Sequence, residues 1–281
     1  MQPLNIRRMQ ASDLPAALKL TQAENWSHRL EDWEFHYRLG RGWVACDEDG
    51  KLLGTILWWP YGKEFGTIGL VVVDRQQQGK GIGRQLMTAV FDEAENRVLQ
   101  LVATQAGLKL YRQCGFRERG GIEQRQGMPT LSAAIAAPAG ITLRSITRDD
   151  VASVCEFDAK VLGADRREVI SAVLNAGTGA LAEQDGRLRA FALMRSSGRG
   201  KAIGPIVASD QRLAVALIAH HLNTSPGFTR LDVPADAAEL SAWLDTVGLA
   251  CVDRVTTMLR GDPPKQYDEV RTYGLISQAL S

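Results

Sequence analysis

Three glycines at alternate positions, Gly79, Gly81 and Gly83, separate an apolar run at residues 70–73 from a helical pattern. Apolar residues recur every four residues from Ile82 onward, as on the buried face of a helix. Glycines let the backbone approach a ligand closely because they have no Cβ. At a strand-to-helix junction, free N–H groups and the helix dipole favour an anion. The stretch therefore predicts a phosphate-binding turn at the start of a helix.

Two common glycine-rich phosphate motifs do not fit this turn. The dinucleotide fingerprint G-x-G-x-x-G needs a glycine at its sixth position, where Arg84 stands. A P-loop needs a glycine five residues before Gly79 and a Ser or Thr after Lys80, and the sequence has neither. A flexible loop that binds nothing is the plain alternative.

The turn does match the pattern Q/R-x-x-G-x-G, through Gln78, Gly81 and Gly83. This resembles the acyl-CoA pyrophosphate loop of the GNAT (general N-acetyltransferase) superfamily. About 30 residues later, residues 110–116 (LYRQCGF) resemble the L-Y-x-x-x-G-F segment that follows the loop in the same superfamily. Two motifs in the expected order make residues 1–128 similar to a catalytic GNAT domain.

The resemblance implies acetyl-CoA as co-substrate and no metal. The N–H groups of the turn would hold the pyrophosphate, and the strand before it would pair with the pantetheine arm and polarise the thioester carbonyl. Lys80 and Arg84 are alternatively solvated helix surface. Gln78 and Thr104 stand where relatives often have Arg and Asn. The cofactor-binding residues implied in this way are Val71, Val72, Val73, Gln78, Gly79, Lys80, Gly81, Ile82, Gly83, Arg84 and Thr104.

Acyl transfer to an amine needs proton transfer as well. An ammonium must lose a proton before it attacks, and the departing thiolate must gain one. Tyr111 matches the family tyrosine that protonates the thiolate; a core tyrosine is the plain alternative. The base is not identified, because residues 67–69 carry no carboxylate where some relatives place a glutamate. Candidates, besides a water chain to solvent, are Glu24, His28, Glu31, Glu34 and His36.

Five of the six tryptophans lie between residues 26 and 59, which favours a buried core because Trp buries a large area. Trp58 and Trp59 are adjacent on a predicted strand and should point to opposite faces. An aromatic pocket that holds an amine by cation–π contact is an alternative use of this cluster.

The composition fits a soluble globular protein of 281 residues, with 45% hydrophobic and 23% charged residues. A net charge of +1 gives no electrostatic reason to expect nucleic acid or an anionic membrane as partner. No apolar run has the length of a signal peptide core or a membrane span. Four scattered cysteines without C-x-x-C predict reduced thiols in a cytoplasmic protein. A monomer or a homodimer is expected.

The predicted elements of the first half follow the order β-α-α-β-β-β-α-β-α-β, with Ser12 as the cap of the first helix and a helix over residues 30–39. Residues 129–140 are rich in Ala and Pro and predict a linker. Residues 141–281 begin like the first half, since residues 143–146 and 150–151 align without gaps on residues 6–9 and 13–14. A second GNAT-like domain is therefore expected there.

The second copy lacks the glycines. Val207 matches Val73, but residues 208–214 contain no glycine, and Leu244 replaces the tyrosine. A degenerate, supporting copy is the main prediction, and a divergent second ligand site is the alternative. The expected fold class is α/β (α+β): tandem GNAT folds, each a mixed, mostly antiparallel twisted sheet flanked by helices.

The function that these features predict is transfer of an acetyl group from acetyl-CoA to a primary amine by direct attack. A small-molecule acceptor is preferred, and a protein lysine is the alternative acceptor. An acyl-CoA sensor or scaffold without turnover is the alternative of a different class.

Overall fold

The structure, a computed structural model, describes residues 4–131, 135–263, 265 and 269–281. It contains a mixed, mostly antiparallel sheet flanked by helices, so the predicted fold class is confirmed. The strands are β1 (Asn5–Arg8), β2 (Arg41–Cys46), β3 (Leu52–Tyr61), β4 (Phe65–Val73), β5 (Val98–Ala103), β6 (Arg117–Gly127), β7 (Thr142–Ser145), β8 (Gly177–Gln184), β9 (Arg187–Ser197), β10 (Gly200–Ala208), β11 (Thr229–Pro234), β12 (Ala250–Arg260) and β13 (Arg271–Gly274). The helices are α1 (Leu14–Ala23), α2 (Leu30–Leu39), α3 (Ile82–Ala94), α4 (Leu108–Gln113), α5 (Val151–Leu162), α6 (Arg167–Asn175), α7 (Gln211–Thr224) and α8 (Ala238–Thr246).

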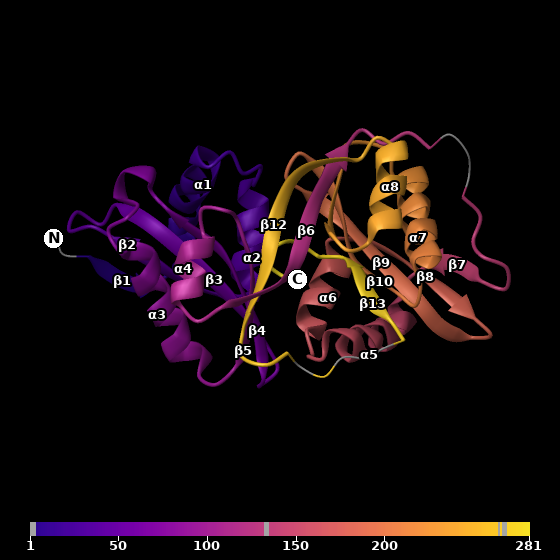
Figure 1. The fold of residues 1–281 in the computed structure, drawn as a ribbon, viewed down its shortest axis with the longest axis horizontal. Coiled ribbons are helices and arrows are strands. Elements are labelled where there is room, and N and C mark those ends of the chain that lie inside the picture. The colour runs from indigo at the N-terminus through magenta and orange to yellow at the C-terminus, as the bar shows by residue number, and fades with distance from the viewer. Residues whose placement is uncertain (1–3, 132–134, 264, 266–268) are drawn as a thin grey trace.

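The two halves share one continuous sheet because each contributes a long strand beside the other. The strand order is β1-β2-β3-β4-β5-β12-β6-β11-β10-β9-β8-β7. Strand β12 of the second half therefore lies between β5 and β6 of the first, and β6 pairs with β11 of the second half. Figure 1 shows β12 and β6 side by side at the centre of the molecule. The domain limits at residues 128 and 141 stay a prediction, and residues 132–134 of the predicted linker lie outside the described residues.

The helices cover both faces of this sheet. In the first half α3 and α4 pack on one face, against Trp58 and Ile68, and α1 and α2 pack on the other, against Trp59. The core beneath α1 and α2 continues without a break into α5 and α6 of the second half, through residues such as Val154 and Ile170. Both halves thus bury apolar side chains in one common core.

The internal repeat extends to individual side chains. Arg7 donates two hydrogen bonds of 2.8 Å to the Asp13 carboxylate, and Arg144 donates two of 2.7 and 2.8 Å to Asp150. These pairs occupy equivalent positions in the gap-free alignment of the two halves. Bidentate pairs of this kind fix the angle between the first strand and the helix that follows.

The structure corrects several expectations from the sequence. The cap of α1 is Asp13, not Ser12, because the Asp13 carboxylate accepts from the backbone of Gln10 and closes the 3₁₀ turn that precedes the helix. Helices α5 and α6 and the strands β12 and β13 were not predicted. The helix over residues 30–39 is confirmed at the expected bounds.

Candidate functional site

The glycine turn lies between β4 and α3, at the strand-to-helix junction that the sequence predicts. Gly79 and Gly81 have φ of +80° and +84°, a region that L side chains rarely adopt, and a Cβ on either would meet no atom within 4 Å. Gly81 is the N-cap of α3 and provides no side-chain cap. The first N–H groups of α3 therefore have neither a helical partner nor a capping side chain. An open, uncapped helix N-terminus of this kind fits a diphosphate.

The polar side chains of the turn form hydrogen bonds within the first half of the chain. Gln78 donates to the carbonyl of Val73 at 3.2 Å, and Lys80 donates to Gln77 at 2.8 Å. Arg84 donates to Gln113 on α4 at 2.8 Å. Lys80 and Arg84 are both exposed, so their charges are available at the surface beside the turn.

Strands β4 and β5 separate just before the turn. They pair in parallel only from Phe65–Val98 to Ile68–Leu101. The backbone then bulges at Leu70, whose φ is +51° and whose carbonyl accepts from the Thr55 hydroxyl at 2.8 Å. Among the described residues, Val72 and Val73 pair with β3, and none of residues 71–73 pairs with β5, which leaves their β5 side open. An extended ligand can add to that edge like a strand.

A cavity of about 490 Å³ opens at this separation. Gly69, Leu70, Val71, Thr104 and Tyr111 of the first half form part of its wall. The second half closes it with residues from the β9–β10 turn, from β11 and from the segment after β13. The structure thus brings Val71, Thr104 and Tyr111 to one cavity, whereas residues 72–84, with Lys80 and Arg84, do not line it.

Tyr111 is held by close packing and is 7% exposed. A Cβ on Gly107 would lie 2.7 Å from Cε2 of the Tyr111 ring, so only glycine fits there. Burial raises the pKa of Tyr111 well above its usual value. Its hydroxyl makes no hydrogen bond to any described residue. Tyr111 therefore carries its proton at neutral pH, with the hydroxyl free to act in the cavity.

The five base candidates lie in different surroundings. Glu24, His28 and His36 line the cavity, whereas Glu31 and Glu34 are exposed and do not. Glu24 is paired with Arg75 at 2.9 Å. Burial lowers the pKa of His28 to about 4, and Nδ1 of His28 is buried with no partner among the described residues.

His36 is more deeply enclosed than His28. Burial, with a further contribution from the Arg195 charge, lowers the pKa of His36 to about 3. Both imidazoles are therefore neutral at physiological pH.

The tryptophans confirm the prediction of opposite faces. Trp58 packs in the core under α3, and Trp59 packs in the core under α1 and α2. The indole of Trp59 donates to the carbonyl of His36 at 3.0 Å. Trp26 alone among the tryptophans lines the cavity. An aromatic cage of several tryptophans around an amine is therefore not present there.

The equivalent place in the second half is filled by the chain itself. Strands β10 and β11 also pair in parallel only briefly, at Lys201–Thr229 and Ala202–Arg230, and then separate. Strand β13 pairs with β10 in this gap, at Ile206–Gly274 and beyond. It thus occupies the edge that corresponds to residues 71–73 of the first half.

The N-terminus of α7, the helix after β10, is also unsuited to bind an anion. Asp210 is the N-cap of α7, and its carboxylate accepts from the backbone N–H of Leu213 at 3.0 Å. A negative charge therefore stands where α3 has only Gly81. These features support the interpretation of the second half as a degenerate copy.

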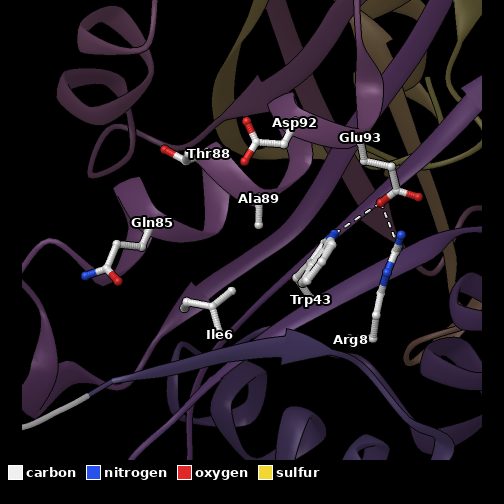
Figure 2. Close-up of a pocket in the computed structure, with 8 residues that line it drawn as sticks. All are labelled: Ile6, Arg8, Trp43, Gln85, Thr88, Ala89, Asp92 and Glu93. Atoms are coloured by element: carbon white, nitrogen blue, oxygen red, sulfur yellow. Dashed lines mark hydrogen bonds and ion pairs between the residues drawn. The ribbon is translucent and has the colours of Figure 1, made fainter.

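A second hollow of about 620 Å³ lies on the outer face of α3, beside β1 and β2. Figure 2 shows Glu93 at one end of it, joined to Arg8 and Trp43. Arg41 and Trp58 also donate to Glu93, at 2.9 and 3.1 Å. Four donors satisfy this carboxylate, so it ties α3 to the sheet and offers little to a ligand.

The described residues contain no cluster of His, Cys, Asp and Glu that could hold a metal ion, and all four cysteines are free. Within the same residues, none of the helices is both long and apolar enough to cross a membrane.

Sequence comparison matches both halves to one family. Residues 6–116 match the profile of the acetyltransferase (GNAT) family, and residues 154–274 match that of an acetyltransferase (GNAT) domain. The chain belongs to the GNAT acyltransferase family. This GNAT protein is 27% identical over 245 residues to the uncharacterised N-acetyltransferase YitH of Bacillus subtilis, covering 86% of this chain and 85% of that protein. It is 24% identical over 271 residues to the holothin acyltransferase of a Pseudoalteromonas species, covering 89% and 88%.

Solved structures share the tandem fold. A Pyrococcus horikoshii protein assigned as an acetyltransferase superimposes with a TM-score of 0.80 at 19% identity, covering 100% of this chain and 97% of that one. A tandem GNAT protein from the clavulanic acid biosynthesis pathway gives 0.64 at 17% identity, covering 95% and 100%. At these identities the likeness concerns the fold alone.

Sequence reasoning missed the part of the cavity that comes from the second half and from β6. These residues include Gln124, Gln126, Arg230, Asp232 and Ser277. The strand exchange brings them together, and no local pattern in the sequence signals that exchange.

Proposed function

We propose that this GNAT acyltransferase transfers an acetyl group from acetyl-CoA to the primary amine of a small molecule. The observation that carries the proposal is the cavity at the separation of β4 and β5, with Tyr111 in its wall and the second half over it. The open edge of residues 71–73 begins at Val71 in the cavity wall and leads along the chain to the glycine turn. Together they form a path of the kind that a nucleotide thioester needs.

In the proposed reaction, acetyl-CoA supplies an activated acyl group. The N–H groups at the start of α3 bind its diphosphate, with favourable helix-dipole placement contributing about 0.3–1 kcal/mol. The backbone of residues 71–73 pairs with its arm and orients the thioester. The neutral amine nitrogen attacks the thioester carbonyl carbon, a C–N bond forms, the C–S bond breaks, and the nitrogen loses one proton to water as the amide forms.

Tyr111 gives its proton to the departing thiolate in this scheme. Its raised pKa keeps the hydroxyl protonated before the step, and the cavity water or solvent returns the proton afterwards. The proton that the acceptor ammonium loses leaves through water in the cavity. No glutamate on residues 67–69 is needed for this exit.

A small acceptor is favoured over a protein lysine because the second half covers the cavity. A flexible lysine on a folded partner would have to pass the β9–β10 turn and the segment after β13. The name of one relative also supports a small molecule, since the Pseudoalteromonas protein is a holothin acyltransferase. A cytoplasmic location and a monomeric or dimeric state stay predictions.

The test combines calorimetry with acetyl-CoA and a thiol-release assay over a panel of primary amines. Gly81→Leu should abolish acetyl-CoA binding, because a branched side chain with φ of +84° strains the turn and fills the diphosphate site. Gly186→Leu is the matched control, since Gly186 has φ of +71° in a turn of the second half with nothing within 4 Å. It should keep the affinity.

Tyr111→Phe should lower kcat while acetyl-CoA binding is retained. Unchanged turnover would remove Tyr111 from the mechanism. Binding of acetyl-CoA without thiol release on any amine would favour an acyl-CoA sensor instead. Absence of binding at millimolar acetyl-CoA would refute the proposal as a whole.

A further inference from the structure

Five polar side chains form a connected row along the cavity wall, which we call the polar ladder. They are Gln124 and Gln126 on β6, Arg230 and Asp232 on β11, and Gln278 after β13. Gln126 lies directly opposite Arg230, and Gln124 lies opposite Asp232. The ladder exists only because β6 of the first half pairs with β11 of the second.

The Asp232 carboxylate determines which atom donates in each hydrogen bond of the ladder. This carboxylate is almost fully buried and accepts from Arg230 at 2.9 and 3.1 Å and from Gln278 Nε2 at 3.0 Å. Because an ionised carboxylate only accepts, Gln278 must present its amide nitrogen to it. The second N–H of that amide donates to Oε1 of Gln124 at 3.4 Å.

The same reasoning continues along β6. Gln124 uses its oxygen for Gln278, and its nitrogen donates to Oε1 of Gln126 at 3.3 Å. Gln126 therefore keeps both N–H donors of its own amide without a partner among the described residues. Arg230 uses Nε and Nη2 on Asp232, which leaves Nη1 without one as well. The ladder thus ends in N–H donors at the cavity wall.

The opposite face of β6 differs in this respect. Glu123 and Arg125 point away from the cavity and are 5% and 4% exposed. Glu123 accepts from Arg125, Arg254 and Ser241, so its acceptors are used within the protein. On the cavity face, Gln126 and Arg230 keep donors that have no partner among the described residues, and the Arg230 side chain is 27% exposed, so solvent meets these donors in the free protein. A ligand oxygen would satisfy them.

We infer that the polar ladder binds a carbonyl or carboxylate oxygen of the acceptor, so that the substrate class is a primary amine that also bears such a group. This inference rests on the proposed function. Gln126 and Arg230 are then specificity-determining residues, which donate to that oxygen while the amine lies toward Gly69 and Leu70. Sites built to hydrogen-bond a substrate group reject analogues that lack it.

The decisive variant is Gln126→Glu. A glutamate oxygen can still accept from Gln124, so the ladder keeps its internal bond, but the cavity then faces an acceptor in place of two donors. The substrates are γ-aminobutyrate, its amide and butylamine, which share a chain and differ in the terminal group. Gln211→Leu, on a surface of α7 away from the cavity, is the control.

We expect wild-type kcat/KM to be about tenfold higher for the amide or the carboxylate than for butylamine. Gln126→Glu should remove that preference, with a larger loss for the carboxylate than for the amide because of charge repulsion. Acetyl-CoA affinity should stay within about twofold, and butylamine turnover should change less than that of the other two amines. Equal wild-type rates on all three amines, or an equal loss on all three in the variant, would overturn the inference.

A second readout separates this inference from the proposed function. Butanamide and butanoate have the terminal group but no amine, and their binding to the protein can be followed by ligand-observed NMR. Binding that Gln126→Glu abolishes would support the ladder even if no amine were acetylated. Binding that is absent, or unchanged in the variant, would overturn the ladder even if amines were acetylated.

Discussion

His36 of the first half and Ser277 of the second face each other with 3.4 Å between Nε2 and Oγ. The other nitrogen of His36, Nδ1, lies 2.6 Å from the carbonyl oxygen of Asp32. A carbonyl cannot donate, so Nδ1 carries the ring proton and Nε2 has a lone pair. The hydroxyl of Ser277 then donates to Nε2. Ser277 lines the cavity, so this pair links the buried core to the acceptor side.

The first prediction is that His36 is a neutral Nδ1–H tautomer that does not titrate between pH 5 and 8. Its folded pKa is about 3, against 6.5 for an ordinary histidine, because burial and the nearby Arg195 disfavour the cation. The unfolded chain therefore binds a proton that the folded protein refuses, and stability should fall as pH drops below 6.5. Nitrogen-15 NMR of labelled histidines tests the tautomer.

Ser277→Ala provides the check on that assignment. This variant should change the nitrogen-15 chemical shift of His36 Nε2 and leave that of Nδ1 unchanged, since only Nε2 faces the serine. An Nε2–H tautomer in the wild type, or titration of His36 near pH 6.5, would contradict the interpretation.

The second prediction concerns Gly107, which holds the Tyr111 ring in place. Gly107→Ala should lower kcat by about tenfold or more, because the new methyl lies 2.7 Å from Cε2 and the ring must shift. Acetyl-CoA affinity should change little. The same substitution in a Tyr111→Phe background should have almost no further effect on kcat, since both changes act through one hydroxyl. Additive losses would place the effect of Gly107 elsewhere.

The sequence was most informative where chemistry depends on local backbone. Gly79 and Gly81 lie in the turn between a strand and a helix that the sequence predicts, with φ of +80° and +84°, and Tyr111 lies at the cavity. Gly115 ends the α4 segment with φ of +85°, as a C-cap glycine should. In each case the conformation is set by neighbours within a few residues, so a single sequence carries the signal.

The sequence could not reveal the parts that depend on distant pairing. Strand β12 ends up between β5 and β6, about 150 residues away in the chain, because each half leaves an edge that the other can fill. The amphipathic pattern of β12 is weak, since it has three consecutive exposed residues, Val252, Asp253 and Arg254. The exchange of strands between the halves also brings the polar residues of the cavity together, so the sequence did not reveal them either.

The third prediction concerns pH and Glu93. Burial alone would raise the pKa of Glu93, but donors from Arg8, Arg41, Trp58 and Trp43 outweigh it and hold the pKa at about 2. Because the folded pKa lies below the usual 4.5, the contribution of Glu93 to stability is full above pH 4.5 and is lost as pH falls toward 2. Denaturation of wild type and Glu93→Gln at several pH values measures this. The variant should be less stable at neutral pH and less sensitive to acid in that window.

The fourth prediction is that one molecule of acetyl-CoA binds per chain. Strand β13 fills the second gap, and Asp210 caps α7. Asp210→Ala should destabilise the protein by about 1 kcal/mol, the usual effect of losing an N-cap, without changing the stoichiometry. Calorimetry of both proteins tests this. A second bound molecule in the wild type would refute the interpretation of the second half as degenerate.

The fifth prediction is that the two halves unfold together, because the exchanged strands are joined by a buried ionic network. Glu123 on β6 accepts from Arg125 at 2.6 Å and from Arg254 of β12 at 2.8 Å, and Arg125 also contacts Asp245 on α8. Glu123→Gln should destabilise both halves by about 3 kcal/mol, since it leaves a buried arginine poorly compensated. Arg254→Ala is the control and should cost less than about 1 kcal/mol, because that side chain is 74% exposed.

Tryptophan fluorescence allows the halves to be followed separately. Five tryptophans report on the first half and Trp243 reports on the second, so Trp243→Phe isolates the first-half signal. With a shared sheet and a shared core, urea should give one midpoint by fluorescence and by circular dichroism, and Glu123→Gln should move both signals equally. Two transitions, with only the second shifted by Glu123→Gln, would mean that the first half folds without the strand it receives. The cavity, which needs β6, β11 and β12 in register, would then form after the halves and not with them.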